Sequence, residues 1–172
     1  EETLNITDSF FGPSGKTVIV ALEHGTMFGV LPELNDTGKM IEKVLSAGVD
    51  GVITSYGIAR KYKSLLKDTR LILRMDGGSR ELSKSLRFKL LYTVEDALAL
   101  GASAVICMGF SGGQQQDTLD NVATLAVQCD KVGLPLIAEM LPGGFSNDIP
   151  KTPENIKLIS RIGAELGAHI VK

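Results

Sequence analysis

The chain has 172 residues, of which 44% are hydrophobic and 22% are charged, values typical of one folded domain. Its 18 lysines and arginines nearly balance its 20 aspartates and glutamates, which argues against a protein that binds nucleic acid or an anionic membrane through a basic patch. The longest apolar runs, such as Val18 to Leu22, are far shorter than the ~20 residues of a membrane span, and the acidic Glu1-Glu2 is unlike a signal peptide. We therefore expect a cytoplasmic protein whose partners are small molecules or other subunits.

Six short, almost entirely apolar runs predict strands that are buried on both faces of a parallel sheet. They are Thr17 to Leu22, Gly51 to Ser55, Arg70 to Met75, Ser103 to Met108, Pro135 to Met140 and His169 to Lys172. Five segments with an apolar stripe at helical spacing predict the helices between them. They are Pro32 to Ala47, Ile58 to Lys67, Val94 to Leu100, Gln114 to Val132 and Pro153 to Leu166. This alternation indicates an α/β fold.

A loose repeat supports the same interpretation, since a helix end, a glycine and a strand follow one another at Gly48, Gly101, Gly133 and Gly167. The pattern alone fits either an open doubly wound sheet or a barrel. A complete barrel of eight βα units needs about 250 residues, whereas six units fit this length. Because the sequence stops in mid-strand at Lys172, we expect residues 1–172 to be a single barrel domain that is incomplete at its C-terminus, in a protein longer by about two βα units.

Ionisable residues follow the apolar runs at four of the six strand ends, where a parallel sheet collects its catalytic groups. Strand one ends in Glu23-His24, strand three in Arg74-Met75-Asp76, strand five contains Glu139, and strand six ends in Lys172. A charge in such a place is costly unless it is paired or used. We expect Lys172 to be buried near Arg74, where it would lose its proton more readily and attack a carbonyl to form a Schiff base. The alternative is a merely terminal, solvated lysine.

Two segments carry a resemblance to a known family. Strand one ends in Glu23-His24-Gly25, and residues 161–172 read Arg-Ile-Gly-Ala-Glu-Leu-Gly-Ala-His-Ile-Val-Lys. From Ala21 to Lys172 the chain resembles the class I aldolase family that includes archaeal-type fructose-bisphosphate aldolases and the autoinducer-2 phosphate thiolase. The resemblance implies a TIM (βα)8 barrel of which strands one to six are visible. It also implies Lys172 as the Schiff-base nucleophile, a small, phosphorylated carbonyl substrate, and a cyclic, often decameric, homo-oligomer.

The chain departs from this family at two positions. Glu23 stands where the family has aspartate, which keeps the charge but moves the carboxylate by about 1 Å. On strand five, Glu139 and Leu141 occupy the places of a tryptophan and a tyrosine that acts as acid and base in the sugar-bisphosphate aldolases. Leucine cannot transfer a proton, so either Glu139 takes over that role or the substrate is not fructose bisphosphate, and we favour the second. The thiolase-like branch, which also lacks the tyrosine, is the closer model there.

These patterns lead to specific assignments. The expected catalytic residues are Lys172, Glu23 and Glu139, and the expected substrate-binding residues are His24, Arg74 and Asp76. Two alternatives stay open for these groups, because Glu23 could be a structural acid paired with Arg74, and Arg74 with Asp76 a structural ion pair. For the protein as a whole, the alternatives are thiolase-like acyl transfer in autoinducer-2 phosphate processing, or an inactive member that serves in binding or assembly.

The remaining reactive residues have simpler interpretations. With two histidines and only Cys107 and Cys129, we expect no metal site, no cofactor, and free thiols in a reducing compartment. His169 has the opposite strand parity to Lys172 and should face the helices. Ser111-Gly112-Gly113 is more simply a glycine turn than an anion site. On the fourth helix, Ala123, Leu125 and Val127 lie off the apolar stripe, so we expect the outer helices to form a homo-oligomer interface.

Overall fold

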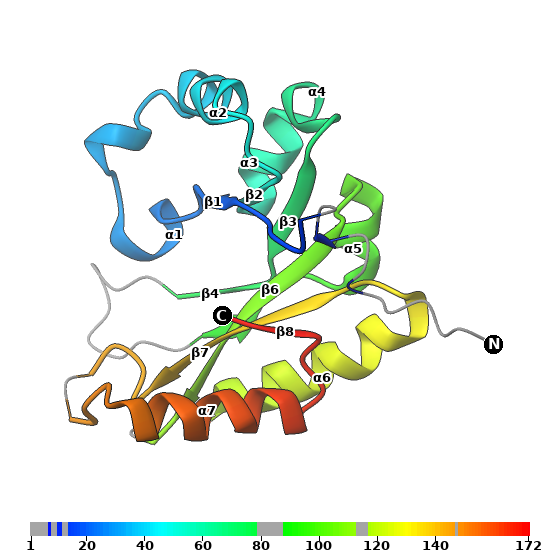
Figure 1. Ribbon diagram of the computed structural model, residues 1–172. Helices are drawn as coiled ribbons and strands as arrows, with labels where there is room; N and C mark the ends of the chain where they lie inside the picture. Colours follow the sequence, from blue (N-terminus) through cyan, green and yellow to red (C-terminus); the bar gives the residue numbers. More distant parts are fainter. Residues whose placement is uncertain (1–6, 8–9, 12–13, 79–87, 113–116, 147) are drawn as a thin grey trace.

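The computed structural model is an α/β half-barrel (Figure 1). It describes residues 7, 10–11, 14–78, 88–112, 117–146 and 148–172. Six parallel strands pair in the order β1-β2-β3-β6-β7-β8 and curl around a common interior. They are β1 (Ile19–Ala21), β2 (Gly51–Thr54), β3 (Arg70–Arg74), β6 (Ala104–Ser111), β7 (Leu136–Pro142) and β8 (Ile170–Val171). The six expected strands and the parallel α/β fold are confirmed.

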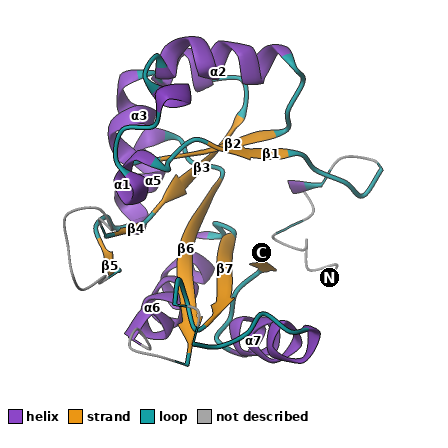
Figure 2. Ribbon diagram, turned by 90° about the vertical axis from the view of Figure 1, so that its left-hand side faces the viewer, coloured by secondary structure: helices purple, strands orange, loops and turns teal. Residues whose placement is uncertain are grey.

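Helices follow the strands and cover the outer face of the sheet (Figure 2). They are α1 (Gly25–Phe28), α2 (Thr37–Ser46), α3 (Tyr56–Lys61), α4 (Lys63–Leu66), α5 (Val94–Leu100), α6 (Asp117–Val132) and α7 (Pro153–Glu165), with a 3₁₀ turn η2 (Pro32–Leu34) before α2. The local sequence explains where several of these helices begin. Thr93 and Asp96 form a reciprocal capping box on α5, and the Thr152 side chain accepts from the Asn155 amide at the start of α7.

The structure corrects the expected helix boundaries in two places. The segment expected as one helix from Pro32 is divided into η2 and α2, because the Asp36 side chain accepts a hydrogen bond from the Lys39 amide and starts a new helix there. The segment expected from Ile58 begins two residues earlier and is interrupted at Tyr62. The short α1 and a two-stranded hairpin, β4 (Asp76–Gly77) with β5 (Lys89–Leu90), were not expected. Residues 113–116, which include the expected start of the fourth helix and Gly113, lie outside the described residues.

Strand residues alternate between two cores, as the period of two requires. One parity faces the helices and packs in the main core, to which Leu73, Cys107 and Ala138 belong. The other parity faces the interior of the half-barrel, where an apolar layer covers the concave side of the sheet. This layer consists of Ile19, Ala21, Ile53, Ile72, Ala104, Ile106, Ile137 and Ile170, with Phe10 packed against it.

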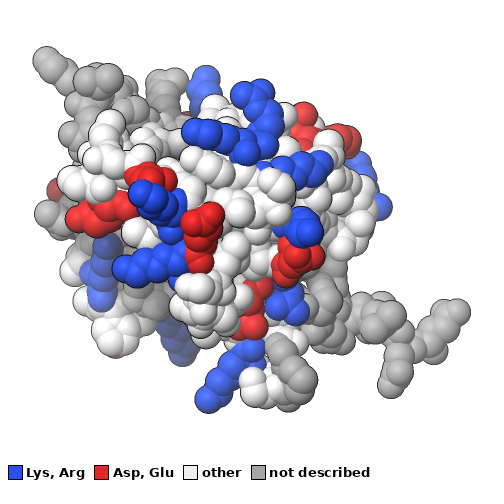
Figure 3. All heavy atoms as spheres, turned by 90° about the horizontal axis from the view of Figure 1, so that it is seen from above, with Lys and Arg blue, Asp and Glu red and all other residues white. Residues whose placement is uncertain are grey.

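The outer surface carries both signs of charge. Figure 3 shows lysines and arginines interspersed with aspartates and glutamates on the face seen from above, without a large patch of one sign. In the described part of the chain, no helix combines the length and the apolar character needed to cross a membrane. Cys107 and Cys129 are both buried and unpaired, as expected.

Candidate active site

The site lies one layer above the apolar floor of the half-barrel, at the carboxyl ends of the strands. Moving two residues along a strand keeps the same side of the sheet. The inward positions that follow Ala21, Ile72, Ile106, Ile137 and Ile170 are therefore the next layer. They are Glu23, Arg74, Met108, Glu139 and Lys172. The four charged members of this layer are connected by ion pairs and, together with Asp76, form what we call the charged ring.

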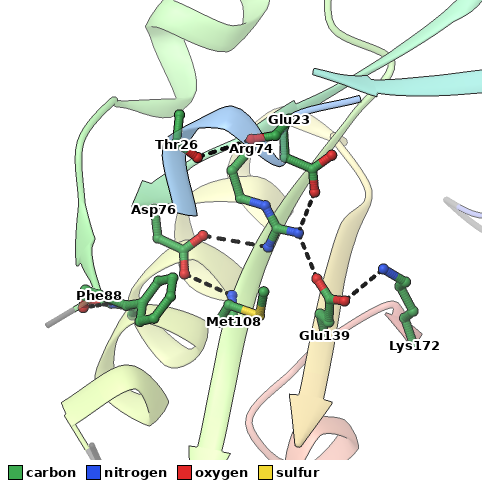
Figure 4. A network of polar contacts seen from close by, with 9 residues as sticks. Glu23, Thr26, Arg74, Asp76, Phe88, Met108, Glu139 and Lys172 are labelled. Atoms are coloured by element: carbon green, nitrogen blue, oxygen red, sulfur yellow. Dashed lines mark hydrogen bonds and ion pairs between the residues drawn. The ribbon is translucent and has the colours of Figure 1, made fainter. Parts of the chain in front are cut away.

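Arg74 is the centre of this ring (Figure 4). Its Nη2 atom donates to Glu23 Oε1 at 2.8 Å and to Glu139 Oε2 at 2.5 Å. Its Nη1 atom lies 3.5 Å from Asp76 Oδ1. Only 3% of the Arg74 side chain is exposed, so three carboxylates surround a buried cation. A guanidinium presents its donors in a planar fork, which allows this one side chain to bridge several carboxylates.

Lys172 joins the ring through Glu139. Its Nζ atom donates to Glu139 Oε1 at 2.6 Å, so the two oxygens of Glu139 bind two different cations. The Lys172 side chain is 48% exposed, whereas that of Glu139 is only 18% exposed. Lys172 also borders a cavity of about 340 Å³ whose wall is mostly apolar and consists of inner-layer side chains together with Phe10, Phe11, Thr17 and Val171. A carbonyl compound in this cavity would lie beside the Lys172 amine.

Burial and neighbouring charges shift the pKa values of Arg74 and Glu139 in opposite directions. Burial disfavours the charged form of Arg74, but Asp76, Glu23 and Glu139 outweigh it and raise the pKa of Arg74 above its usual range. Burial would also raise the pKa of Glu139, but Arg74 and Lys172 together hold the pKa of that carboxyl below its ordinary value. Glu139 is therefore a carboxylate at neutral pH.

For Asp76, burial has a larger effect on the pKa than the neighbouring charges have. Desolvation raises the pKa of Asp76 to about 6, although Arg74 and the backbone amide of Met108 oppose the shift. The Met108 amide donates to Asp76 Oδ2 at 2.8 Å, which connects the carboxylate to the middle of the sheet. Asp76 belongs to the hairpin strand β4 and lies two residues beyond Arg74, on the same side. The expected common orientation of Arg74 and Asp76 is confirmed.

The two carboxylate oxygens of Glu23 differ in their contacts with the described residues. Oε1 binds Arg74, but Oε2 is buried and accepts no hydrogen bond from any residue that the structure describes. A buried acceptor without a donor is costly, and such atoms gather where a ligand binds. Glu23 is therefore both anchored by Arg74 and able to accept a proton or a hydroxyl group.

His24 lies outside the charged ring. It is the residue before α1, is half-buried, and its ring stacks on Phe28 with 6.1 Å between centroids. Phe28 in turn contacts Phe145, which also contacts Phe88 and Phe110. This aromatic cluster lies beside Asp76 at the mouth of the half-barrel, as Figure 4 shows for Phe88. The strand patterns gave no sign of it, because its members come from separate loops and strands.

The structure thus brings together five of the six expected site residues, namely Glu23, Arg74, Asp76, Glu139 and Lys172. The expected surroundings of Lys172 were wrong, since the lysine is half-exposed and a carboxylate, not Arg74, contacts it. Sequence reasoning missed the Met108 amide. Because Met108 has the same parity as Ile106, strand register could have placed it beside the ring.

Two other expectations concerned residues away from the ring. His169 faces the helices, as expected: its Nδ1 accepts from the Leu136 amide, and its Nε2 lies 3.0 Å from Asp130 of α6. Gly112 has a φ of +79°, which supports the glycine-turn interpretation. Among the described residues, no group of three or more histidines, cysteines or acids could hold a metal ion.

Comparison with known proteins identifies relatives of this chain. A synthase from Archaeoglobus fulgidus, 2-amino-3,7-dideoxy-D-threo-hept-6-ulosonate synthase 1, is 31% identical over 92% of this chain and 60% of its own length. The class 1 fructose-bisphosphate aldolase of Thermoproteus tenax is 30% identical over 98% of this chain and 66% of its own length. The chain therefore spans less than two thirds of the length of these relatives.

Solved structures match the fold as well. A structure from a study of reaction intermediates of the Schiff-base-forming fructose-1,6-bisphosphate aldolase has a TM-score of 0.84 and 31% identity, covering 97% of this chain and 70% of that one. An archaeal fructose-1,6-bisphosphate aldolase, with its catalytic lysine covalently bound to the carbinolamine intermediate, has a TM-score of 0.82 and 29% identity, covering 97% and 69%. The model of the DeoC/LacD family aldolases matches residues 17–172. The chain belongs to the DeoC/LacD aldolase family.

Proposed function

We propose that this protein is a class I aldolase that makes or breaks a carbon–carbon bond through a Schiff base on Lys172. The observation that carries the proposal is the position of Lys172, which ends β8 above the apolar floor and binds Glu139 within a ring of charged residues. The fold similarity to an aldolase whose catalytic lysine is bound to a carbinolamine supports the same chemistry.

In the proposed reaction, the Lys172 amine attacks a ketone carbon and the carbinolamine loses water to give an iminium. The iminium withdraws the electron pair of the adjacent carbon–carbon bond, which breaks as a proton leaves the neighbouring hydroxyl and an aldehyde departs. The resulting enamine takes up a proton at carbon, and water then releases the second product and the free lysine. No metal or cofactor is needed at any step.

We assign the proton transfer at the hydroxyl to Glu23. Its Oε2 atom is buried and accepts from no described residue, whereas both oxygens of Glu139 are bound to cations. Arg74 holds Glu23 in place through the other oxygen. With three carboxylates around it, Arg74 is better suited to positioning these acids than to binding substrate. We propose that Asp76 helps to hold Arg74 in place. We also propose that His24 contacts the substrate at the mouth of the half-barrel.

A small keto sugar or ketone with a phosphate group is the proposed substrate. The names of relatives support it, including a 2-amino-4,5-dihydroxy-6-oxo-7-(phosphonooxy)heptanoate synthase from Streptomyces griseus that is 28% identical. Both cations of the ring are already paired with carboxylates, so the phosphate would bind elsewhere, which we place after the seventh and eighth strands of a complete barrel. We favour a substrate other than fructose bisphosphate, since Leu141 replaces the expected tyrosine.

Thiolase-like acyl transfer is the second candidate, and Leu141 is the observation that favours it. Leu141 packs with the aromatic cluster and offers no proton, as in the thiolase-like branch of the resemblance. Acyl transfer to a thiol acceptor would distinguish the two activities, because an aldolase releases a free aldehyde and needs no acceptor thiol.

Trapping of the Schiff base tests the main proposal. The protein is mixed with dihydroxyacetone phosphate, fructose 1,6-bisphosphate or a free keto sugar, reduced with borohydride and measured by intact mass and peptide mapping. We expect a covalent adduct on Lys172 that is absent from Lys172→Met. Lys39→Met is the matched control, because Lys39 is also paired with a carboxylate, Asp36, but lies on the exposed face of α2. An adduct on another lysine, or none with any probe, would refute the proposal and favour the inactive, binding alternative.

We also propose a closed homo-oligomer formed through the outer helices, in the cytoplasm, where the free thiols of Cys107 and Cys129 would stay reduced. Exposed apolar side chains support it on α6 and α7, namely Val127, Val132, Ile156 and Leu158. The expected contribution of Leu125 is wrong, since that side chain is buried in the main core. Light scattering at micromolar concentration tests this proposal, and a monomer would contradict it.

A further inference from the structure

The two glutamates that bind Arg74 are not equivalent. Glu139 uses one oxygen for Lys172 Nζ at 2.6 Å and the other for Arg74 Nη2 at 2.5 Å, so both of its oxygens already bind cations. Glu23 uses only Oε1 for Arg74, and Oε2 accepts from no described residue. A group that shuttles protons needs a free oxygen that can reach the substrate. Glu23 has an oxygen that accepts from no described residue, whereas both oxygens of Glu139 are bound to cations.

The contact between Glu139 and Lys172 has a second consequence for Schiff-base chemistry. When a lysine ammonium condenses with a ketone, the products are an iminium and one water: the carbonyl oxygen leaves with two of the three ammonium hydrogens, and the nitrogen keeps the third. The charge on that nitrogen is therefore +1 both before and after condensation. Glu139 faces the same charge at the same atom in the free enzyme and in the iminium.

A neighbouring carboxylate stabilises this iminium against loss of its last proton. Glu139 is largely buried, which lowers the dielectric on its side of the contact, while Lys172 is about half exposed. Every charged group in the ring affects how readily the iminium loses this proton. Arg74 on β3 contacts Glu139 directly, Glu23 after β1 and Asp76 on β4 contact Arg74, and β6 contributes only the uncharged Met108 beside Glu139.

We propose that Glu139 is the counter-ion that keeps the Lys172 Schiff base protonated, and that Arg74 is the positioning residue that holds Glu139 directed at the lysine. This assignment rests on the Schiff-base function proposed above. It separates two tasks that one acid could perform: Glu139 stabilises the electron sink, and Glu23 moves the proton. A neutral imine is a poor electron sink, so loss of the counter-ion reduces the reactive fraction at alkaline pH.

Cyanoborohydride trapping measures this property, because the reagent reduces the protonated iminium and not the neutral imine. The probe is the compound from the panel above that the native protein traps best, and the adduct is quantified by intact mass from pH 6 to pH 10. We expect Glu139→Gln to lower the alkaline midpoint of trapping by at least about one pH unit, which is a tenfold loss of adduct above that midpoint. Glu139→Asp should recover part of the shift. Glu165→Gln, which removes an exposed carboxylate on α7, is the control and should leave the midpoint unchanged.

A second variant separates a missing charge from a disturbed fold. Glu139→Ala leaves space beside Lys172 that formate can occupy, so added formate should restore the alkaline midpoint of that variant without affecting the native protein. Unchanged midpoints in Glu139→Gln and Glu139→Ala would overturn the counter-ion assignment while leaving the Schiff base on Lys172 in place. An unchanged midpoint with a reduced kcat would make Glu139 an acid–base group instead. Absence of an adduct in the native protein with every probe would overturn the proposed function, and this assignment with it.

Discussion

Glu23 and Glu139 lie far apart in the sequence but accept hydrogen bonds from the same nitrogen atom, Nη2 of Arg74. Each lies two residues beyond an apolar inner-layer position, Ala21 or Ile137, so the curl of the sheet brings the two carboxylates together. Two buried carboxylates repel each other, and Asp76 adds a third. The geometry of the site therefore depends on a single buried cation.

Replacing Arg74 by methionine should destabilise the protein by about 3–5 kcal/mol, because it leaves buried carboxylates without a counter-charge while keeping an apolar stem of similar length. The free energy of unfolding in urea measures this loss. Arg161→Met is the control, since Arg161 pairs with Glu165 on the exposed face of α7 and should contribute less than about 1 kcal/mol. Equal effects of the two substitutions would show that the ring does not hold the site together.

Replacing Glu23 by glutamine should lower kcat by about 10² to 10⁴ while leaving Schiff-base trapping at Lys172 nearly intact. Glutamine keeps the size of the side chain and an oxygen for Arg74, but it cannot take up a proton. Borohydride trapping and turnover are measured on the same preparation. Glu33→Gln, at an exposed position in η2, should change neither. Parallel loss of trapping and turnover in Glu23→Gln would place Glu23 in a structural role.

Most of the fold could be predicted from sequence because each βα unit has a local signature. The six apolar runs, with glycine before several of them, gave the right strands, and glycine takes a left-handed φ at Gly48, Gly101, Gly133 and Gly167. The breaks within helices could not be predicted in the same way. At Asp36 a polar side chain competes for a backbone amide within an otherwise helical pattern, and only the folded geometry decides the outcome.

The identity of the charged ring could be predicted, but its pairing could not. Strand parity places Glu23, Arg74, Glu139 and Lys172 on the inner side, and the structure shows them together. The pairing of acids with cations depends on the curl of the sheet and on side-chain lengths. The spacing of residues in the sequence does not reveal either. For this reason Lys172 was expected beside Arg74 and is found beside Glu139 instead.

Replacing Gly109 by alanine should destabilise the protein by about 1–3 kcal/mol. Gly109 faces the outer side of β6, where a Cβ atom would lie 3.1 Å from Val122 Cγ2 on α6 and would also overlap the thioether of Met140. Thermal or urea unfolding measures the effect. Gly57→Ala is the matched control, because nothing lies within 4 Å of a Cβ there, and alanine in α3 should be neutral or slightly stabilising. A neutral Gly109→Ala would show that Met140 can move without cost.

The pKa of Asp76 makes the stability of the protein depend on pH in a definite direction. Since burial raises the pKa of Asp76 to about 6, the folded state keeps a proton between pH 4 and pH 6 that the unfolded state has lost, so the free energy of unfolding should fall as pH rises through this range. Glu139 has the opposite effect, because its lowered pKa adds stability that is lost only below its ordinary value of 4.5. Between pH 5 and pH 7 only Asp76 contributes of these two acids, and the free energy of unfolding should fall by about 1 kcal/mol.

Urea unfolding across this range measures the change. The free energy of unfolding should fall with pH in the native protein and change less in Asp76→Asn, while Asp68→Asn, at an exposed position, should follow the native protein. Identical slopes for the native protein and Asp76→Asn would contradict the raised pKa; the two histidines are common to all three proteins and cancel from the comparison.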